Sequence, residues 1–184
     1  MTSLLITTSR RTCNRVRSFI SDLEVAFPDS TRFNRGSMNL AELAGRIRAS
    51  GANAALVVTT YKGNPGEIHV YDSDGNRTHN IRIDGVVLRR DVAPSYKARI
   101  ETIHELRIKE DSSHQTCSLA DLVATWIDRD ITEADSALPV GSSAKGEVIF
   151  WFEDLPGGQT LWTLHDAASG IEVGPRIRID KIKT

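Results

Sequence analysis

Arginine side chains cluster in the segment TTSRRTCNRVRSF, residues 7–19, where a short apolar run gives way to a helical pattern. The four arginines are Arg10, Arg11, Arg15 and Arg17. Positive charge in the first turns of a helix opposes the helix macrodipole, which is positive at that end. The cluster therefore indicates either that no helix begins here or that the arginines face an anion. Guanidinium groups form forked hydrogen bonds with phosphate, so phosphate is the anion they favour.

The elements that would position these arginines follow a βαβαβ pattern. A strand at 3–7, a helix with apolar residues at Val16, Phe19, Ile20, Leu23 and Phe27, a strand at 31–35, a second helix and a strand at 54–60 succeed one another. Asn39 and Glu42 have the spacing of a capping box at the start of the second helix, and Gly51 ends it. Short connections and right-handed crossovers predict a parallel three-stranded sheet packed against helices.

Cations follow all three predicted strands. Arg10 and Arg11 come after the first strand, Arg35 after the second and Lys62 after the third. The carboxyl ends of parallel strands share one edge of a sheet, where open α/β sheets bind ligands. Together with the free N–H groups of helix N-termini, these cations predict a phosphate-binding edge.

Two features of this edge, the pair Arg15 and Arg17 and the segment 62–67, can also be explained without a bound phosphate. Arg15 and Arg17 fit the anion site, but they equally fit a solvated helix face opposite the apolar stripe. The segment KGNPGE, residues 62–67, predicts a turn that presents Lys62. It lacks the GxxxxGK[ST] spacing of a phosphate-binding P-loop.

The pattern changes after residue 65. Alternating residues over 66–92, with Asp74-Gly75 and Asp84-Gly85 as hairpin signals, predict an antiparallel meander. Residues 96–110 fit a strand or a helix, and their alternation favours a strand. A third helix is expected to open at Ser118 with Asp121. Further strands are expected at 147–154, 160–166 and 176–182, the first two joined by an LPGGQ hairpin loop.

Charge is distributed unevenly along the chain. Residues 1–62 carry nine Lys or Arg against four Asp or Glu, a net +5, whereas residues 63–184 carry a net −6. Residues 101–135 hold nine carboxylates against three cations and should repel phosphate. This asymmetry predicts a directed electrostatic face.

Catalytic and cofactor signals are weak. His104, His114 and Cys117 lack the spacing of a standard metal site, and GxSxG, HExxH and GxGxxG motifs are absent from the sequence. We therefore expect no enzymatic activity, no cofactor and no metal. Trp126, Trp151 and Trp162 lie within apolar patterns and are expected in the core, so recognition by exposed aromatic stacking has little support.

The chain has the character of an intracellular protein. Cys13 and Cys117 are far apart and are expected to be free thiols in a reducing compartment. No apolar run approaches the ~18 residues of a membrane span. The first 25 residues hold four arginines instead of a signal-peptide core, so a cytoplasmic location is expected.

Several of these elements, in their order, resemble a known family. The segments LLITTSRRTCNRVRSFISDLEVAFPDSTRFNRGSMNLAELA, ALVVTTYKGNPGEIHVY and EVGPRIRIDKI look like the Brix-domain proteins of ribosome biogenesis. The resemblance is to the archaeal, extension-free branch related to the eukaryotic small-subunit processome member. It runs through residues 3–72 and 147–182, and the region around 95–146 departs most.

The resemblance implies a fold, a partner and a set of site residues. The implied fold is α/β, a single domain over 1–184 with two similar docked halves, about 1–92 and 93–184, each like the anticodon-binding domain of class II aminoacyl-tRNA synthetases. The implied partner is precursor ribosomal RNA, with no cofactor and no chemistry. The family's basic surface carries over to Arg10, Arg11, Arg35 and Lys62, and further to Arg176 and Arg178 of the GPRIRI element.

These observations lead to the hypothesis of an assembly factor that holds the RNA backbone through arginines and helix N-termini. The alternative is a protein-interaction scaffold whose acidic second half docks a basic ribosomal or assembly protein. An enzyme acting on a small phosphate ligand at the same strand ends is the third possibility.

Overall fold

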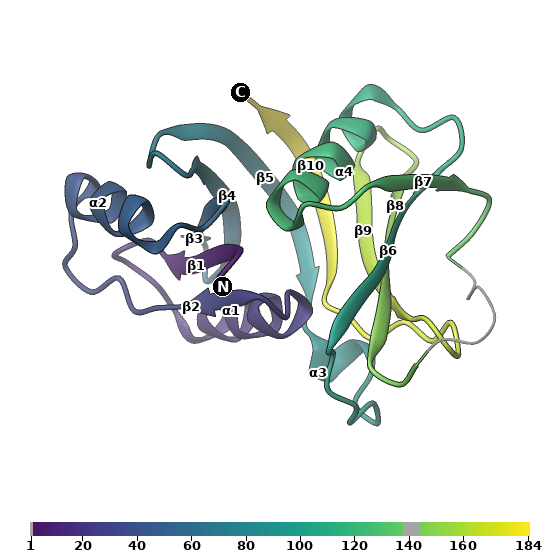
Figure 1. Ribbon diagram of the computed structural model, residues 1–184. Helices are drawn as coiled ribbons and strands as arrows, with labels where there is room; N and C mark the ends of the chain where they lie inside the picture. Colours follow the sequence, from purple (N-terminus) through teal and green to yellow (C-terminus); the bar gives the residue numbers. More distant parts are fainter. Residues whose placement is uncertain (1, 138–143) are drawn as a thin grey trace.

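The computed structural model describes residues 2–137 and 144–184, which form ten strands and four helices (Figure 1). In chain order these are β1 (Leu4–Thr8), α1 (Asn14–Ala26), β2 (Ser30–Arg32), α2 (Leu40–Ser50), β3 (Ala54–Tyr61), β4 (Asn64–Asp72), β5 (Arg77–Val87), α3 (Arg89–Val92), β6 (Thr102–Lys109), α4 (His114–Ile127), β7 (Ile131–Ala134), β8 (Glu147–Asp154), β9 (Thr160–Asp166) and β10 (Arg176–Lys183). The fold is therefore mixed α/β, as the sequence predicts.

All ten strands belong to one sheet in the order β2-β1-β3-β4-β5-β10-β9-β8-β6-β7. In the first five strands, which we call the N-terminal run, β1 pairs in parallel with β2 and β3, and β3, β4 and β5 are antiparallel. In the C-terminal run, β6 pairs in parallel with β7 and β8, and β8, β9 and β10 are antiparallel. β5 and β10 pair antiparallel in the middle and make the sheet continuous (Figure 1). The predicted parallel β2-β1-β3 unit is confirmed.

The helices cover the sheet unequally. α1 and α4 contribute to one large core on the same side, where Phe19 and Leu23 of α1 join Val123 and Trp126 of α4. α2 belongs to a separate cluster on the other side, which includes Leu43 and Ile47 of the helix and Leu5, Ala55 and Val57 of the sheet. The alternation of side chains along β1 and β3 sends successive residues to these two cores. Strands buried on both faces explain the continuous apolar run over 54–58.

Phe27, the residue that ends α1, joins the two runs. Its ring centroid lies 5.2 Å from that of Phe150, 6.0 Å from Trp162 and 6.2 Å from Trp126, all in edge-on geometries. Aromatic pairs in such geometries add to the free energy gained from burial alone. The three tryptophans are 1–5% exposed, so their predicted place in the core is confirmed.

The second predicted helix has the caps that the sequence indicates. The Glu42 N–H donates to Asn39 Oδ1 over 2.9 Å, and the Asn39 N–H donates to Glu42 Oε2 over 2.8 Å. Gly51 ends α2 at φ 70°, a left-handed conformation that suits glycine.

The prediction of a hairpin at Asp84-Gly85 is wrong, because no turn forms there. β5 continues through both residues to Val87 because β10 pairs alongside it. Gly85 faces the Arg178 guanidinium, and a Cβ at residue 85 would lie only 2.8 Å from an Arg178 nitrogen. Arg178 also contacts Asp84 over 3.2 Å. The dipeptide is therefore a close cross-strand contact and not a turn.

Two other boundaries differ from the sequence prediction. The third predicted helix begins at His114 and not at Ser118, because the Ser113 hydroxyl accepts a hydrogen bond from the Thr116 N–H and caps it. The predicted turn over 62–67 is shorter: Lys62 and Gly63 turn the chain at φ 47° and 77°, and Asn64 already belongs to β4. The ambiguous segment does form a strand, over Thr102–Lys109, with a register shift after Ile103.

Candidate nucleic-acid interface

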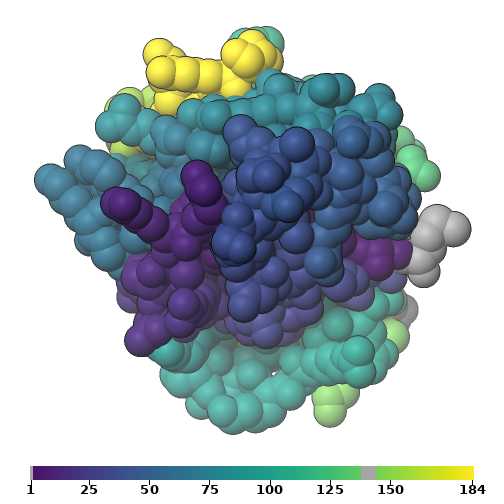
Figure 2. Space-filling model, turned by 90° about the vertical axis from the view of Figure 1, so that its left-hand side faces the viewer, coloured from purple at the N-terminus to yellow at the C-terminus, as the bar shows by residue number. Residues whose placement is uncertain are grey.

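The loop between β1 and α1 is tied to the end of β3 and the turn that follows. The Ser9 N–H donates to the Val58 carbonyl over 2.9 Å, and the Thr60 hydroxyl donates to the Arg11 carbonyl over 3.4 Å. The Cys13 thiol donates to the Gly63 carbonyl over 3.3 Å. These contacts hold the loop that carries the exposed Arg10 and Arg11 against the strand end and turn that carry the exposed Lys62. The purple N-terminal segment projects at one side of the face that Figure 2 shows.

The N-terminus of α1 opens toward these cations. Cys13 is its N-cap but makes no capping hydrogen bond to the helix, and the first turn contains no acidic residue. The first backbone N–H groups of a helix have no partner within it and attract anions together with the macrodipole. Figure 1 shows α1 starting next to the ends of the parallel strands. The geometry is suited to a phosphate group.

A cavity of about 530 Å³ lies at the same edge, beside α1 and the ends of β1 and β2. It is lined by Thr8, Thr12, Arg17, Ile20, Arg32, Phe33 and Asn34. The Thr12 Oγ1 atom is buried and has no hydrogen-bond partner among the described residues. A buried hydroxyl without a hydrogen-bond partner costs free energy.

Four of the eight predicted site residues remain available to a ligand. Arg10, Arg11, Arg17 and Lys62 are exposed, and none of them forms an ion pair within the described part of the chain. We call these four residues the basic edge. Figure 2 shows the face of the molecule that α2 dominates, with the N-terminal segment at its margin.

The other four predicted residues already have protein partners. Arg15 Nη2 donates to the Val86 carbonyl over 3.0 Å, and Arg35, only 9% exposed, donates to the Met38 carbonyl over 3.1 Å. Arg176 makes two hydrogen bonds of 2.8 and 2.6 Å to the Glu172 carboxylate, which raises the pKa of the guanidinium. Arg178 pairs with Asp84. The structure thus gives these arginines internal roles.

The N-terminus of α4, the helix between the parallel strands β6 and β7, has side-chain partners that α1 lacks. Asp154, the last residue of β8, accepts hydrogen bonds from the Ser113 N–H at 2.7 Å and from the Ser113 and Thr116 hydroxyls, both at 2.6 Å. Burial disfavours the charged form of Asp154, but these bonds outweigh that effect and hold its pKa below the ordinary value. Asp154 thus holds Ser113, whose hydroxyl caps α4, whereas α1 has no side-chain cap.

Replacing this carboxylate should destabilise the protein. We expect Asp154→Ala to lower the free energy of unfolding by about 1–2 kcal/mol, because the Ser113 N–H and two hydroxyls, including the one that caps α4, lose their acceptor. The lowered pKa means that the stabilisation is present above the ordinary value near 3.8 and disappears as the pH falls through the folded pKa. Urea unfolding at pH 7 and at pH 3 measures both effects. Glu153→Ala is the control of equal charge, and equal stabilities of the two variants at pH 7 would contradict the capping role.

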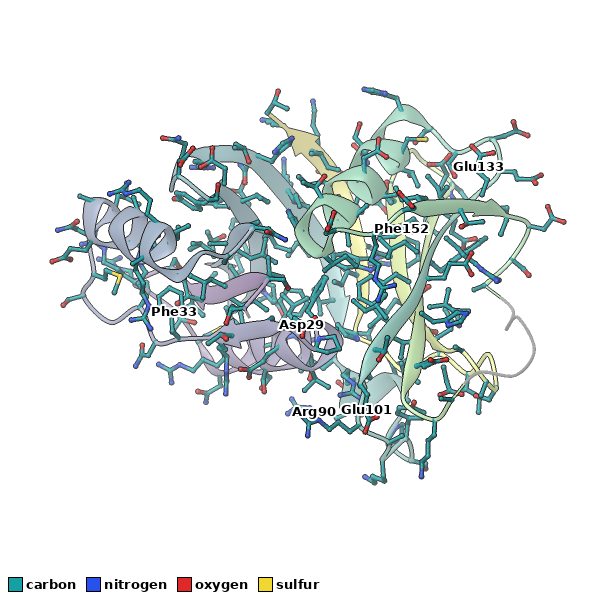
Figure 3. All side chains as sticks on the ribbon, viewed as in Figure 1. Asp29, Phe33, Arg90, Glu101, Glu133 and Phe152 are labelled. Carbon is teal, nitrogen blue, oxygen red and sulfur yellow. The ribbon has the colours of Figure 1, made fainter. Side chains whose placement is uncertain are left out.

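Carboxylates follow β6 and β7 where cations follow β1 and β2. Glu110, Asp111, Glu133 and Asp135 are all exposed, and we call them the acidic edge. The Asp135 carboxylate raises the pKa of Glu110, since two like charges lie close together. Figure 3 shows Glu133 at the end of the molecule opposite to Phe33. The two edges are therefore well separated and opposite in charge.

Sequence reasoning missed Thr12, Asn34 and Arg32, which line the cavity beside α1, and also Tyr61 next to Lys62. The only feature of the sequence that could have indicated them is their position within a few residues of a predicted strand end. The suggested group of His104, His114 and Cys117 is not brought together as a metal site. Among residues 2–137 and 144–184, no three His, Cys, Asp or Glu side chains converge to hold a metal ion. None of the described helices is long and apolar enough to span a membrane.

Comparison of the whole fold places the chain in a defined class. A crystal structure of a probable ribosomal biogenesis protein from Aeropyrum pernix K1 superimposes with a TM-score of 0.75, over 98% of this chain and 97% of that one, at 28% sequence identity. The structure of Mil, an archaeal Imp4-like protein, matches with a TM-score of 0.65 over 98% and 99% of the two chains at 21% identity, a likeness of fold. The ten-stranded mixed α/β fold is thus that of archaeal Imp4-like proteins.

Sequence comparison identifies the relatives more closely. A probable Brix domain-containing ribosomal biogenesis protein from Aeropyrum pernix is 42% identical over 90 residues, 47% of this chain and 50% of that protein. The corresponding protein from Methanopyrus kandleri is 46% identical over 67 residues, 36% and 35% of the two chains. The bovine U3 small nucleolar ribonucleoprotein protein IMP4 is 32% identical over 89 residues, 48% of this chain and 31% of that protein.

The chain is therefore a relative of the archaeal Brix-domain ribosomal biogenesis proteins, and the resemblance seen in the sequence is confirmed. In these matches the chain spans about half or less of the length of the curated relatives. No family model matches the chain.

Proposed function

We propose that this protein is a ribosome assembly factor that binds the backbone of precursor ribosomal RNA through its basic edge, acting in the cytoplasm without cofactor or chemistry. One observation supports this above the others. Four exposed cations without ion pairs in the described structure lie in α1 and in the loops after β1 and β3, and α1 has no side-chain cap, whereas α4 is capped by Ser113. The names of the relatives, which describe ribosomal biogenesis proteins and not enzymes, agree with it.

The proposed contacts follow from the geometry of each residue. Arg10, Arg11 and Lys62 would reach phosphates on the surface, and Arg17 would contact one in the cavity beside α1. Arg15 and Arg35 would hold the backbone in place. Arg176 and Arg178 could contact the RNA only if phosphates replaced the carboxylates of Glu172 and Asp84.

The repeated strand pairing supports the architecture that the resemblance implies. We propose one domain over residues 1–184 whose halves, about 1–92 and 93–184, are similar and each resemble the anticodon-binding domain of class II aminoacyl-tRNA synthetases. Each run has two parallel pairings followed by an antiparallel meander, and β5 and β10 join the halves. The basic edge belongs to the first half and the acidic edge to the second.

Titration of labelled ribosomal RNA fragments at several salt concentrations, with transfer RNA as competitor, tests the proposed function. Four phosphate contacts on single-stranded RNA predict that the logarithm of the association constant falls with the logarithm of salt with a slope of about −3. Preference for particular ribosomal fragments over transfer RNA is expected. A slope near zero, or no binding near physiological salt, would contradict RNA binding by this edge.

The second candidate function is a protein-interaction scaffold that binds a basic ribosomal or assembly protein at the acidic edge. The raised pKa of Glu110 favours it, because a cationic partner would relieve the repulsion between Glu110 and Asp135. Association with purified ribosomal proteins should then survive nuclease treatment. It should be lost when Glu133→Gln is combined with Asp135→Asn.

A further inference from the structure

Tyr61 exposes an aromatic ring at the margin of the basic edge. Its exposed fraction is 64%, and among the described large apolar side chains only Leu40 and Ile171 are similarly exposed. Leu40 begins α2 and Ile171 lies between β9 and β10, whereas Tyr61 is the last residue of β3 and directly precedes Lys62. The aromatic ring therefore stands beside cations, which distinguishes it from an ordinary exposed apolar side chain.

The backbone around Tyr61 is fixed to the loop that carries Arg10 and Arg11. The preceding residue, Thr60, donates to the Arg11 carbonyl, and Gly63 accepts from the Cys13 thiol. The Lys62 ammonium lies 5.4 Å from the centroid of the Tyr61 ring, within the range of a cation–π contact. Aromatic ring, ammonium and arginine loop thus form one anchored unit.

An open space lies next to the ring. A cavity of about 710 Å³ is lined by Tyr61, Thr59, Thr60, Gly66 and Ile83, and by the charged side chains of Glu67, Arg82, Asp84 and Asp180. A Cβ at residue 66 would lie 2.7 Å from the Tyr61 Cβ, so only glycine lets the backbone run this close to the tyrosine. The volume falls within the range of about 300–1,000 Å³ that is usual for ligand pockets.

We propose that Tyr61 stacks on an unpaired base of the RNA whose phosphates contact the basic edge, so that the protein selects single-stranded or looped segments over duplex. The inference rests on the proposed RNA-binding function and specifies its substrate. Bases inside an A-form duplex are stacked on each other and cannot reach a tyrosine on a strand end. An unpaired base can leave the backbone and enter the space beside the ring, and stacking accepts any base because each has a π-face.

Binding of two matched RNAs tests this proposal. One is a single-stranded oligonucleotide, and the other is a fully paired duplex with the same number of nucleotides. The single strand is expected to bind wild-type protein more tightly. Tyr61→Ala should weaken binding of the single strand about tenfold, the scale of one lost base–aromatic stack, and leave duplex binding unchanged. Tyr61→Phe retains the ring and should bind as wild type.

Two further readouts separate stacking from a structural or ionic effect. The salt dependence should be the same for Tyr61→Ala and wild type, because no charge is removed. A 2-aminopurine base in the single strand should lose fluorescence when it stacks on the wild-type protein and keep it with Tyr61→Ala. Leu40→Ala, which removes an equally exposed side chain at the start of α2, is the control and should change neither readout.

The outcomes distinguish this inference from the proposed function. Equal binding of the single strand by wild type and Tyr61→Ala, or an equal loss for single strand and duplex, would overturn the stacking role while salt-dependent RNA binding stood. Absence of salt-dependent binding of either RNA by wild-type protein would refute the proposed function and the stacking role with it.

Discussion

Phe27→Ala is expected to lower the free energy of unfolding by about 3–5 kcal/mol, the usual cost of removing a buried phenylalanine ring. Phe27 is 1% exposed and follows α1, but its aromatic contacts Trp126, Phe150 and Trp162 all belong to the C-terminal part of the chain. The cavity left behind would lie between α1, α4 and the sheet, where three large rings cannot close it without moving α4.

Urea unfolding followed by tryptophan fluorescence measures this effect, since two of the three contact rings are tryptophans. Leu40→Ala serves as the control, because Leu40 is 63% exposed and its truncation should change stability by less than about 0.5 kcal/mol. A loss below about 1 kcal/mol for Phe27→Ala would mean that this ring does not join the two runs. Two separate unfolding transitions in the variant would show that it is their main connection.

Replacement of both Arg10 and Arg11 by alanine is expected to weaken RNA binding roughly 10- to 100-fold at low salt, as two charge-assisted phosphate contacts are lost. The weakening should be similar for all RNA sequences, and the salt slope should become shallower by about 1.4 units, the share of two of the four contacts. Both arginines are exposed, so stability should hardly change. Fluorescence anisotropy across a salt series measures the affinity and the slope together.

Arg176→Ala with Arg178→Ala is the matched control, because it removes the same charge. These two guanidinium groups are paired with Glu172 and Asp84, and a phosphate would have to displace a carboxylate to bind them. We expect less than a threefold loss of affinity from this pair, a change well below 1 kcal/mol. A loss equal to that of the Arg10 and Arg11 variant would extend the RNA surface to β10. Unchanged binding by the Arg10 and Arg11 variant would remove the basic edge from the proposal.

The sequence alone predicts the local elements well. The apolar spacing from Val16 to Phe27 matches α1, the Asn39 and Glu42 pair caps α2 with both hydrogen bonds, and the apolar run at 54–60 matches β3. These features depend on side-chain periodicity and on contacts three or four residues apart, which a sequence states directly. It also places Arg10, Arg11 and Lys62 at one edge, because parallel strands have a common direction.

Local sequence signals for turns and helix starts give wrong predictions where tertiary contacts favour a different structure. Asp84-Gly85 has the composition of a hairpin, yet pairing with β10 keeps it extended and the glycine makes room for Arg178. Ser118 with Asp121 has the spacing of a helix start, yet Ser113 begins α4 because Asp154, distant in sequence, binds its N–H and hydroxyl. In both places the deciding partner lies more than 40 residues away in the chain.

Composition, helical and strand periods, the βαβαβ order and the separation of positive and negative charge are determined by the sequence itself. Only the tertiary structure decides which cations stay available: Arg15, Arg35, Arg176 and Arg178 meet internal acceptors, while Arg10, Arg11, Arg17 and Lys62 do not within the described residues. It alone shows that β5 pairs with β10, that Asp154 binds Ser113 at the start of α4 and that Tyr61 remains exposed. The physical reason is that hydrogen bonds, ion pairs and burial depend on residues that the fold brings together from distant parts of the chain. The local spacing of apolar and polar residues does not specify which distant residues meet.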